Sequence, residues 1–204
     1  MSEQKIICGD CLPIMRGYKD KQFDLVLCDP PYGIGASSEK FVNGNRKVAR
    51  PSENGEWDNK IPDPEYFEEM FRVSKNQIIW GGNYFVLHLY PSRCFLIWDK
   101  TIHGNSYADC EMAWTSFDAN ARIKAINMIA TTMDGRVHPT QKPVELMKWC
   151  LGLFPETQTI LDPFLGSGTT LVACKQLNRN GVGIEISEKY CEIARQRLQQ
   201  SILL

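Results

Sequence analysis

The stretch "TILDPFLGSGTTLVACKQL", Thr159–Leu177, joins a short β-branched run, an acidic turn, a glycine pair and a helical segment. Gly166 and Gly168 permit tight backbone geometry and close approach of a ligand, and a helix is expected to begin at Thr169. A phosphate-binding P-loop needs Gly-Lys-Ser/Thr, and this loop has no lysine. The pattern therefore predicts a strand–loop–helix unit of an α/β protein, with a loop suited to a ligand that lacks phosphate.

Two acidic residues define that ligand further. Asp162 stands at the end of the strand before the loop, where a carboxylate repels phosphate but suits a cationic or amine-bearing group. One strand later, "GVGIEIS", Gly181–Ser187, carries Glu185 at the spacing typical of a ribose-binding carboxylate. S-adenosylmethionine combines a sulfonium, an ammonium and a ribose without phosphate, so we expect it as the cofactor. A doubly wound sheet with incidental glycines is the alternative.

Composition narrows the class of protein. The 204 residues are 43% apolar and 23% charged, which is ordinary for a globular protein with one core. The net charge of −1 gives no overall basic footprint for nucleic acid, although a basic strip on one face is compatible with a neutral total. Apolar runs fall short of the ~18 residues of a membrane helix, so a cytoplasmic protein without a membrane partner is expected.

The eight cysteines are expected to be reduced and structural. Cys8 and Cys11 have C-x-x-C spacing, but a zinc site would need a second ligand pair and a redox site a thioredoxin-like helix start. We therefore expect no metal site.

Alternating β-rich and helical patterns predict a mostly parallel sheet covered on both faces, in one domain of residues 1–204. The expected strands are Lys5–Cys8, Phe23–Cys28, Gln77–Trp80, Cys94–Trp98, Glu111–Thr115, Thr159–Leu161 and Gly181–Ile186. The expected helices are Pro64–Val73, Pro143–Leu153, Thr169–Leu177 and Glu188–Gln200.

A second motif, "FDLVLCDPPYGIG", Phe23–Gly35, ends a core strand on a carboxylate followed by two prolines. Asp29 and the carbonyl of Pro30 offer rigid acceptors, and Tyr32 offers a flat face for a planar molecule. An exocyclic amine of adenine or cytosine supplies two donors and a ring. Accepting both hydrogens favours a pyramidal nitrogen and frees its lone pair to attack a sulfonium methyl group.

Together the motifs resemble the amino-methyltransferases of DNA, in the beta group, where "DPPY" precedes "DPFLGSGTT". "HPTQKP", His138–Pro143, resembles that group's additional cofactor segment, and "ICGDC", Ile7–Cys11, its adenine-facing segment. The resemblance covers nearly the whole chain. It implies a single-domain, Rossmann-like methyltransferase fold with circularly permuted motif order. The implied sheet is mixed and seven-stranded, has helices on both faces and ends in an antiparallel hairpin.

The resemblance assigns site residues position by position. It implies a catalytic tetrad of Asp29, Pro30, Pro31 and Tyr32. It places Glu185 on the ribose, Asp10 with Cys11 on the adenine, and 140–142 over the methionine carboxylate. The full implied cofactor set is Asp10, Cys11, Thr140, Gln141, Lys142, Asp162, Pro163, Phe164, Gly166, Gly168, Thr169, Thr170, Glu185 and Ile186.

Two irregular stretches are the expected DNA contacts. Residues 36–62 form a polar loop after the tetrad, expected to be mobile and to order on the target strand. Residues 117–137 are a short candidate target-recognition region. The expected DNA-binding side chains are Arg46, Lys47, Arg50, Arg122 and Lys124. Because the second stretch is short, a homodimer that shares recognition stays open.

The sequence favours transfer to N6 of a flipped adenine in double-stranded DNA. Aspartate at position 29 leans toward adenine, but N4 of cytosine remains an alternative. A methyltransferase acting on RNA or on a protein amide is a further alternative, disfavoured by the order of the motifs. A DNA-binding partner without its own activity is disfavoured because both motifs are intact.

Overall fold

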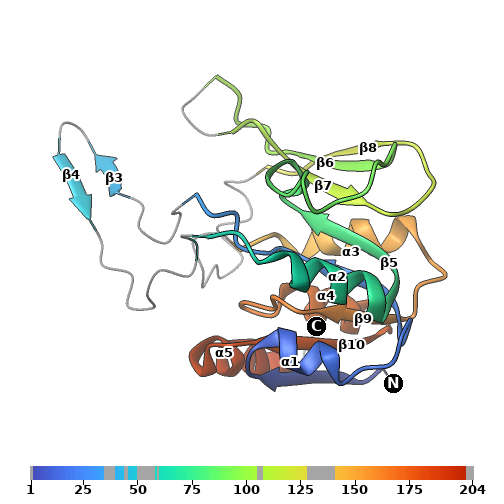
Figure 1. Cartoon of the computed structure of the whole chain (residues 1–204). Coiled ribbons are helices and arrows are strands. Elements are labelled where there is room, and N and C mark those ends of the chain that lie inside the picture. Colours follow the sequence, from blue (N-terminus) through green and yellow to red (C-terminus); the bar gives the residue numbers. More distant parts are fainter. Residues whose placement is uncertain are drawn as a thin grey trace.

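The computed structural model describes residues 2–34, 58, 60–104, 108–127 and 141–200, and the main chain of 40–43 and 46–49. Its central element is an eight-stranded sheet in the order β1-β10-β9-β2-β5-β7-β6-β8 (Figure 1). These strands are β1 (Gln4–Cys8), β2 (Phe23–Cys28), β5 (Ser74–Trp80), β6 (Phe95–Asp99), β7 (Cys110–Thr115), β8 (Arg122–Ala125), β9 (Thr159–Asp162) and β10 (Asn180–Glu185).

Within this sheet β7 is antiparallel to both of its neighbours, whereas every other pairing is parallel. The strands β1, β10, β9, β2 and β5 therefore all end at the same edge, and β7 begins there. β1, which comes first in the chain, pairs with β10, which comes last, as the permuted motif order implies. The α/β fold with a mixed sheet is confirmed.

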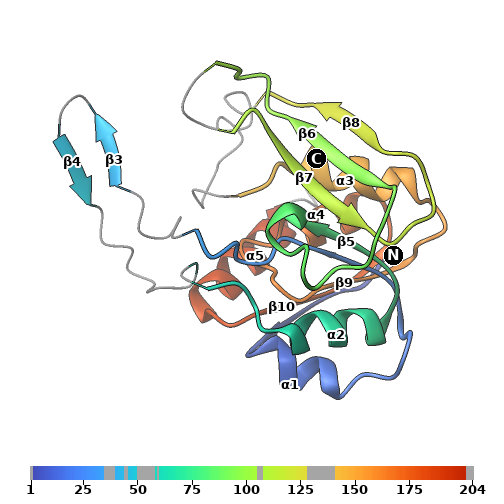
Figure 2. The same cartoon turned by 45° about the horizontal axis from the view of Figure 1, so that its top comes forward.

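The expected count of seven strands is wrong by one. β8 adds to the outside of β6, in parallel register from Leu96↔Arg122 to Asp99↔Ala125 (Figure 2). The sequence analysis placed these four residues in the recognition region. A four-residue edge strand that alternates charged and apolar side chains is indistinguishable from a loop by periodicity alone. Part of the predicted recognition region is thus sheet.

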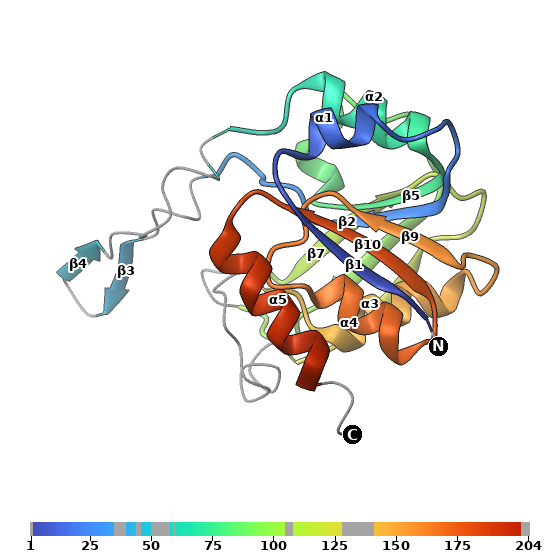
Figure 3. The same cartoon turned by 90° about the horizontal axis from the view of Figure 1, so that it is seen from below.

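Helices cover both faces of the sheet (Figure 3). One layer holds α1 (Cys11–Arg16) and α2 (Pro64–Val73), and the other holds α3 (Val144–Leu153), α4 (Thr169–Gln176) and α5 (Glu188–Gln200). The four expected helices are present. Proline stands at N1 of α2 behind Asp63, which fits its missing donor and fixed φ.

The two layers bury opposite sides of the same strands. Leu25 and Leu27 of β2 pack with α3 and α4, whereas Val26 and Cys28 pack with α1 and α2. All four side chains are at most 1% exposed. This period of two with both faces apolar is what a central parallel strand requires, and it fixes the register of the strand.

The expected loop 36–62 contains a second sheet, formed by the antiparallel pair β3 (Lys40–Asn43) and β4 (Arg46–Ala49). The main chain of Arg46 and Lys47 belongs to β4, and Arg50 lies outside the described residues. The expected mobility of the loop is not tested. None of the described helices is both long and apolar enough to cross a membrane.

At the amino end of β2, Asp24 ties three segments together. Its Oδ2 accepts hydrogen bonds from the backbone nitrogens of Gln158 and Thr159, each at 3.0 Å, and from the Thr159 hydroxyl at 2.9 Å. Its Oδ1 accepts from Nζ of Lys75 at 2.8 Å. Burial alone would raise the pKa of Asp24, but these donors outweigh it and hold the pKa at about 2.

Asp24→Asn should lower the free energy of unfolding by about 1–3 kcal/mol at neutral pH, because a charged acceptor of several donors is lost. The folded-state pKa lies below the ordinary 3.8, so this stabilisation is present above about pH 4 and disappears as the pH falls toward 2. Urea unfolding at pH 7 and at pH 2.5 measures the difference between wild type and variant. A difference of equal size at both pH values would contradict the assignment.

Candidate active site

Four acidic side chains come to one edge of the sheet because parallel strands end there. Asp10 follows β1, Glu185 ends β10, Asp162 ends β9 and Asp29 follows β2. The strands are adjacent in that order, so the two predicted motifs lie side by side although they are more than a hundred residues apart in the chain. In open α/β sheets, ligands bind outside this edge.

The predicted tetrad forms a compact hydrogen-bonded unit. The Tyr32 hydroxyl donates to Oδ1 of Asp29 at 2.5 Å. Asp58 fixes the backbone after the prolines, since its Oδ1 accepts from the nitrogens of Tyr32 (2.7 Å) and Gly33 (3.0 Å). Asp58 is 2% exposed, so these buried hydrogen bonds join the end of the loop 36–62 to the residues that precede the loop.

Glycine lets the tyrosine ring approach the end of β5. A Cβ on Gly81 would stand 2.2 Å from Cε1 of Tyr32, and Gly81 has φ +74. The Tyr32 ring also stacks on Tyr84, with centroids 4.8 Å apart and planes at 15°. Tyr84 ends the 3₁₀ turn η2 (Gly82–Tyr84) and is 42% exposed. Tyr32 therefore has a fixed position, and its partner is open to solvent.

Lys142 lies at the tetrad. Its Nζ donates to Oδ2 of Asp29 at 2.7 Å and to the Tyr32 hydroxyl at 3.1 Å, and it pairs with Oε2 of Glu111 at 2.8 Å. The sequence analysis assigned Lys142 to the methionine carboxylate, and that role stays a prediction. In the structure its three donor positions are directed at these three acceptors.

Glu111 and Lys100 complete a group of four ionisable side chains. Oε1 of Glu111 pairs with Nζ of Lys100 at 2.8 Å. Burial opposes ionisation of Glu111, but Lys142 and Lys100 outweigh it and hold its pKa at about 2. Burial raises the pKa of Asp29, with Lys142 opposing and Glu111 adding to that effect. The group contains two carboxylates and two ammonium groups.

The glycine loop and Glu185 form the predicted cofactor cleft. The backbone nitrogen of Gly166 donates to Oε2 of Glu185 at 2.8 Å, and that of Ser187 donates to Oε1 at 2.8 Å. The backbone nitrogen of Ile186 also donates to this carboxylate, which leaves one of its four acceptor positions for a hydroxyl group. A Cβ on Gly166 would meet nothing within 4 Å, whereas one on Gly168 would stand 2.8 Å from Cβ of Ala194. Gly166 thus faces open space and Gly168 allows α5 to pack.

Asp162 is the buried acid of this cleft, at 3% exposure. Its Oδ1 accepts from the nitrogen of Phe164 at 3.0 Å. Burial raises the pKa of Asp162 to about 7, while Thr170 and the Phe164 nitrogen oppose the shift. A cation bound next to it would restore full ionisation.

The remaining predicted cofactor residues are divided between the cleft and the core. Asp10 is exposed and caps α1 by accepting from the nitrogen of Leu12 at 2.9 Å, whereas Cys11 is buried at 6% exposure. Tyr66 of α2 joins this corner, with its hydroxyl 3.3 Å from Oδ1 of Asp10 and its ring 6.2 Å from that of Phe164.

The other predicted cofactor residues differ in their surroundings. Gln141 Oε1 accepts from the Ser167 hydroxyl at 3.1 Å, which brings it beside the glycine loop. Thr169 accepts from Nη1 of Arg197 at 3.2 Å. Pro163 and Thr170 are buried, and Ile186 is 74% exposed. Thr140 lies outside the described residues.

Of the predicted DNA contacts, the side chains of Arg122 and Lys124 are described. They lie two residues apart on β8 and so share one face of an edge strand. Arg122 is exposed and Lys124 half-buried. Residues 128–137 of the predicted recognition region lie outside the described part of the chain.

The sequence analysis missed Glu111, Lys100, Asp58, Tyr66 and Tyr84. Glu111 and Lys100 gave no local signal, because their relevance depends on β7 running opposite to its neighbours. Tyr66 lies beside Asp10 and Tyr84 stacks on Tyr32, and both contacts join segments that are far apart in the sequence.

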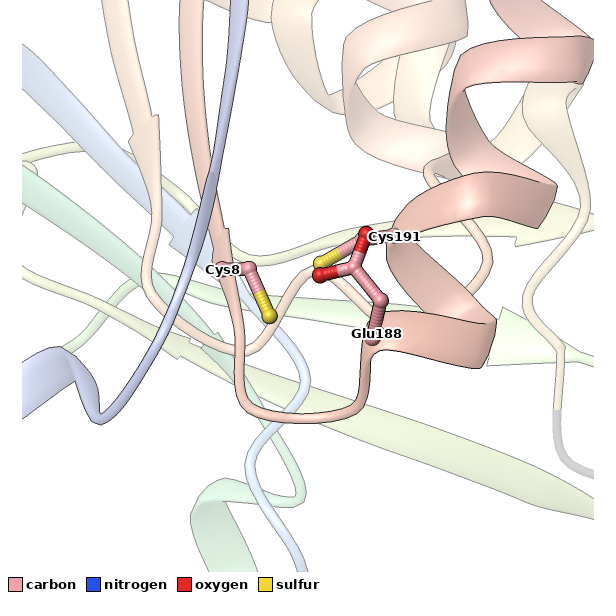
Figure 4. A group of neighbouring side chains, drawn as sticks. All are labelled: Cys8, Glu188 and Cys191. Carbon is pink, nitrogen blue, oxygen red and sulfur yellow. The ribbon is translucent and has the colours of Figure 1, made fainter.

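The structure also brings together three side chains that could bind a metal ion, two thiols and one carboxylate. Cys8 at the end of β1 lies beside Glu188 and Cys191 of α5, with their ligand atoms all within 4.8 Å of one another (Figure 4). The sequence analysis did not foresee this cluster, since it compared Cys8 only with Cys11. Glu188 is exposed and pairs with Arg195 at 2.7 Å, so an ion would compete with an existing partner.

The chain is similar to known proteins in sequence and in fold. A family model for a DNA methylase of the N6/N4 type matches residues 97–196. The type II methyltransferase M.HpaI of Haemophilus parainfluenzae is 26% identical over 96% of this chain and 74% of its own length.

Two solved structures share the fold. An M1.HpyAVI complex with SAM has a TM-score of 0.63 and 20% identity, over 96% of this chain and 98% of that one. The cytosine-N4-specific PvuII DNA methyltransferase has a TM-score of 0.65 and 14% identity, over 97% of this chain and 86% of that one. Residues 97–196 of this chain thus match the N6/N4 DNA methylase family, and the relatives of the chain are type II DNA methyltransferases.

Proposed function

We propose that this protein transfers the methyl group of S-adenosylmethionine to the exocyclic N6 of an adenine flipped out of duplex DNA. The observation that carries the proposal is the adjacency of β2, β9 and β10. It sets the acceptor tetrad at Asp29 beside the cleft of Asp162 and Glu185. An amine and a methyl donor held at those two places would meet at one edge of the sheet.

The donor set of the cleft suits this cofactor. Asp162 and Glu185 are both carboxylates, and the residues from 162 to 170 include no basic side chain. When bound, S-adenosylmethionine supplies an electrophilic methyl group on a sulfonium. Glu185 would accept from a ribose hydroxyl, Asp162 would face the cationic methionine end, and Asp10 with Tyr66 would border the adenine. The M1.HpyAVI–SAM complex has the same fold.

The tetrad provides the acceptor chemistry. The carboxylate of Asp29 and the carbonyl of Pro30 would each accept a hydrogen from the target amine. This draws the nitrogen lone pair out of the ring so that it attacks the methyl group. The Tyr32 ring, held by Gly81 and Tyr84, would stack on the base. After transfer the nitrogen carries a positive charge and releases a proton, for which Asp29 is the adjacent acceptor.

DNA contacts are proposed for the basic side chains of the two stretches outside this centre. They are Arg46, Lys47, Arg50, Arg122 and Lys124, which would meet phosphates. The residues after β8 lie at the tetrad edge of the sheet, since β8 is parallel to β6 and so ends at that edge, whereas the residues before β8 lie at the opposite edge.

A second candidate is transfer to N4 of cytosine. It is favoured by the fold similarity to the cytosine-N4-specific PvuII enzyme. The TM-score of that enzyme to this chain is as high as that of the M1.HpyAVI complex. Both amines present two hydrogens to the same acceptors, so the tetrad alone does not separate them. Proposing adenine rests on aspartate at position 29.

Labelled methyl transfer from S-adenosylmethionine to duplex DNA, followed by digestion to nucleosides, tests the function. N6-methyldeoxyadenosine is the expected product. N4-methyldeoxycytidine would replace the adenine proposal by the second candidate. Bound cofactor without any methylated nucleoside, on DNA of varied sequence, would favour a DNA-binding partner without activity.

Asp29→Ala should lower the rate of methyl transfer by at least about 100-fold, because a preorganised acceptor of the amine is lost. The affinity for S-adenosylmethionine should change little, since the cleft is built from other strands. Calorimetry measures that affinity, with Asp29→Asn as the isosteric control for packing. Loss of cofactor binding in both variants would place Asp29 in the cofactor site instead.

Gly81→Ala should lower the methylation rate about 100-fold, since its Cβ requires Tyr32 to move and its φ of +74 disfavours alanine. Gly152→Ala is the matched control, because Gly152 lies on α3 and a Cβ there meets nothing within 4 Å. Steady-state methylation rates and the affinity for S-adenosylmethionine are measured for both variants and for the wild type. A Gly81→Ala enzyme as fast as the control would show that the position of Tyr32 is immaterial.

Activity should be unchanged in excess chelator, because methyl transfer from a sulfonium to an amine needs neither a Lewis acid nor activated water. Rates are compared with and without chelator in wild type and in Cys8→Ser, which removes one thiol of the three-ligand cluster. A loss of activity on chelation that Cys8→Ser reproduces would assign a functional ion to that cluster.

A further inference from the structure

The charged group at the tetrad extends beyond the residues that would touch the base. Lys142 is 6% exposed and lies between the carboxylates of Asp29 and Glu111, at 2.7 and 2.8 Å. Glu111 in turn lies between Lys142 and Lys100. Each inner member of the chain Asp29–Lys142–Glu111–Lys100 therefore has a partner of opposite sign on both sides.

The fold explains why Glu111 reaches this place. β7 runs antiparallel, so its second residue lies at the edge where the parallel strands end. The backbone nitrogen of Gly81 donates to the carbonyl of Met112 at 2.9 Å, which joins the start of β7 to the turn under Tyr32. Lys100 directly follows β6 and donates its own nitrogen to the carbonyl of Asp109 at 3.0 Å. The main chain thus fixes the places of Glu111 and Lys100 in this group.

Resting on the function proposed above, we propose that Glu111 is a positioning residue of the methyl-transfer site, which acts through Lys142 on the carboxylate of Asp29. Lys142 orients that carboxylate by holding its Oδ2, while Tyr32 holds its Oδ1. The second lone pair of each oxygen remains for the target amine. The side chain of Asp29 is 26% exposed, compared with 6% for Lys142, so it is the more accessible end of the chain.

Glu111 does more than fix Lys142 in space. An isolated pair with lysine would make Asp29 a weak acceptor, because the full positive charge would act on it. Sharing Lys142 with Glu111 divides that charge between two carboxylates. Asp29 is then oriented by Lys142, and because Glu111 acts to raise its pKa, the carboxylate keeps enough electron density to accept hydrogens from the amine and, after transfer, the proton.

Other groups near Asp29 also influence its pKa. Asp162 at the end of β9 and Cys28 of β2 interact with Asp29 electrostatically, and Tyr32 donates to it. Tyr84 of η2 contacts the ring of Tyr32. Asp162 is a like charge and lies on the cofactor side. The contribution of Glu111 is therefore measured by changing Glu111 and Lys100 while these neighbours stay constant.

Two substitutions should move Asp29 in opposite directions. Glu111→Gln removes a negative charge and leaves Lys142 to Asp29 alone, so the pKa of Asp29 should fall by about one pH unit or more. Lys100→Met removes a positive charge and should raise the pKa of Asp29. Carboxyl carbon NMR of the free protein, with the Asp29 signal assigned by Asp29→Asn, measures both shifts without relying on activity.

The rates should follow the same order. In Glu111→Gln the maximal methylation rate should fall about 10-fold or more, and the acid limb of the pH profile should move to lower pH, because the limb follows ionisation of Asp29. Glu111→Asp, which keeps the charge, should recover part of the rate. Asp24→Asn is the matched control at the other end of β2, where lost stability should leave the pH profile unchanged.

The outcomes separate this proposal from the function on which it rests. An unshifted Asp29 signal in folded Glu111→Gln and Lys100→Met would overturn the role of Glu111, even with wild-type methylation intact. A wild type that methylates no nucleoside would overturn the proposed function, whatever the NMR shifts. Should Glu111→Gln fail to fold, Lys100→Met and Glu111→Asp still decide: equal Asp29 titrations in both variants and the wild type would contradict the proposal.

Discussion

The gathering of carboxylates at one edge of a parallel sheet is the constraint on which this protein is built. β1, β10, β9 and β2 deliver Asp10, Glu185, Asp162 and Asp29 to that edge. Like charges in a partly buried place disfavour ionisation, and burial accordingly raises the pKa of three of them, Asp29, Asp162 and Glu185. The fold has to stabilise the ionised carboxylates locally, and it does so differently on the two sides of the edge.

On the cofactor side the donors are uncharged, namely backbone nitrogens and the Thr170 hydroxyl beside Asp162. Glu185 and Asp162 accept from backbone nitrogens of the glycine loop and of the turn after β10. These dipoles carry no net charge, so the cleft stays attractive to a cation. On the tetrad side the donor is the ammonium of Lys142, which neutralises Asp29 and is balanced by Glu111. The first solution leaves a charge for a ligand, and the second leaves an oriented acceptor.

The sequence predicted the fold class, the permuted order and the place of both motifs, because each depends on local patterns. The glycine pair, the aspartate before the prolines and the apolar runs of β2 can all be read within a dozen residues. β8 escaped prediction since four residues are too few to establish a period and its apolar side chains, Ile123 and Ala125, are exposed. Glu111 and Lys100 escaped because Glu111 pairs with Lys100 after β6 and with Lys142 before α3, and only the three-dimensional sheet brings these segments together.

The predicted role of Lys142 shows the limit of a motif. A lysine one residue from Gln141 is expected to share its function, and Gln141 does lie at the glycine loop through Ser167. Adjacent residues in an extended segment point to opposite sides, however, so the next side chain enters the other half of the site. The segment 141–142 thus spans both halves. One residue contacts the cofactor loop and the next contacts the tetrad.

This division has a consequence for turnover under the proposed function. The donor carries a sulfonium charge, whereas the product left after methyl transfer is a neutral thioether. A cleft bordered by Asp162 and Glu185, with no basic side chain from 162 to 170, attracts the former more strongly than the latter. The carboxylate of Asp29 does not add to this attraction, because its charge is already paired with Lys142, which Glu111 shares. Separating the two carboxylate environments therefore lets one edge of a sheet bind a cationic donor, release a neutral product and keep a constant acceptor beside both.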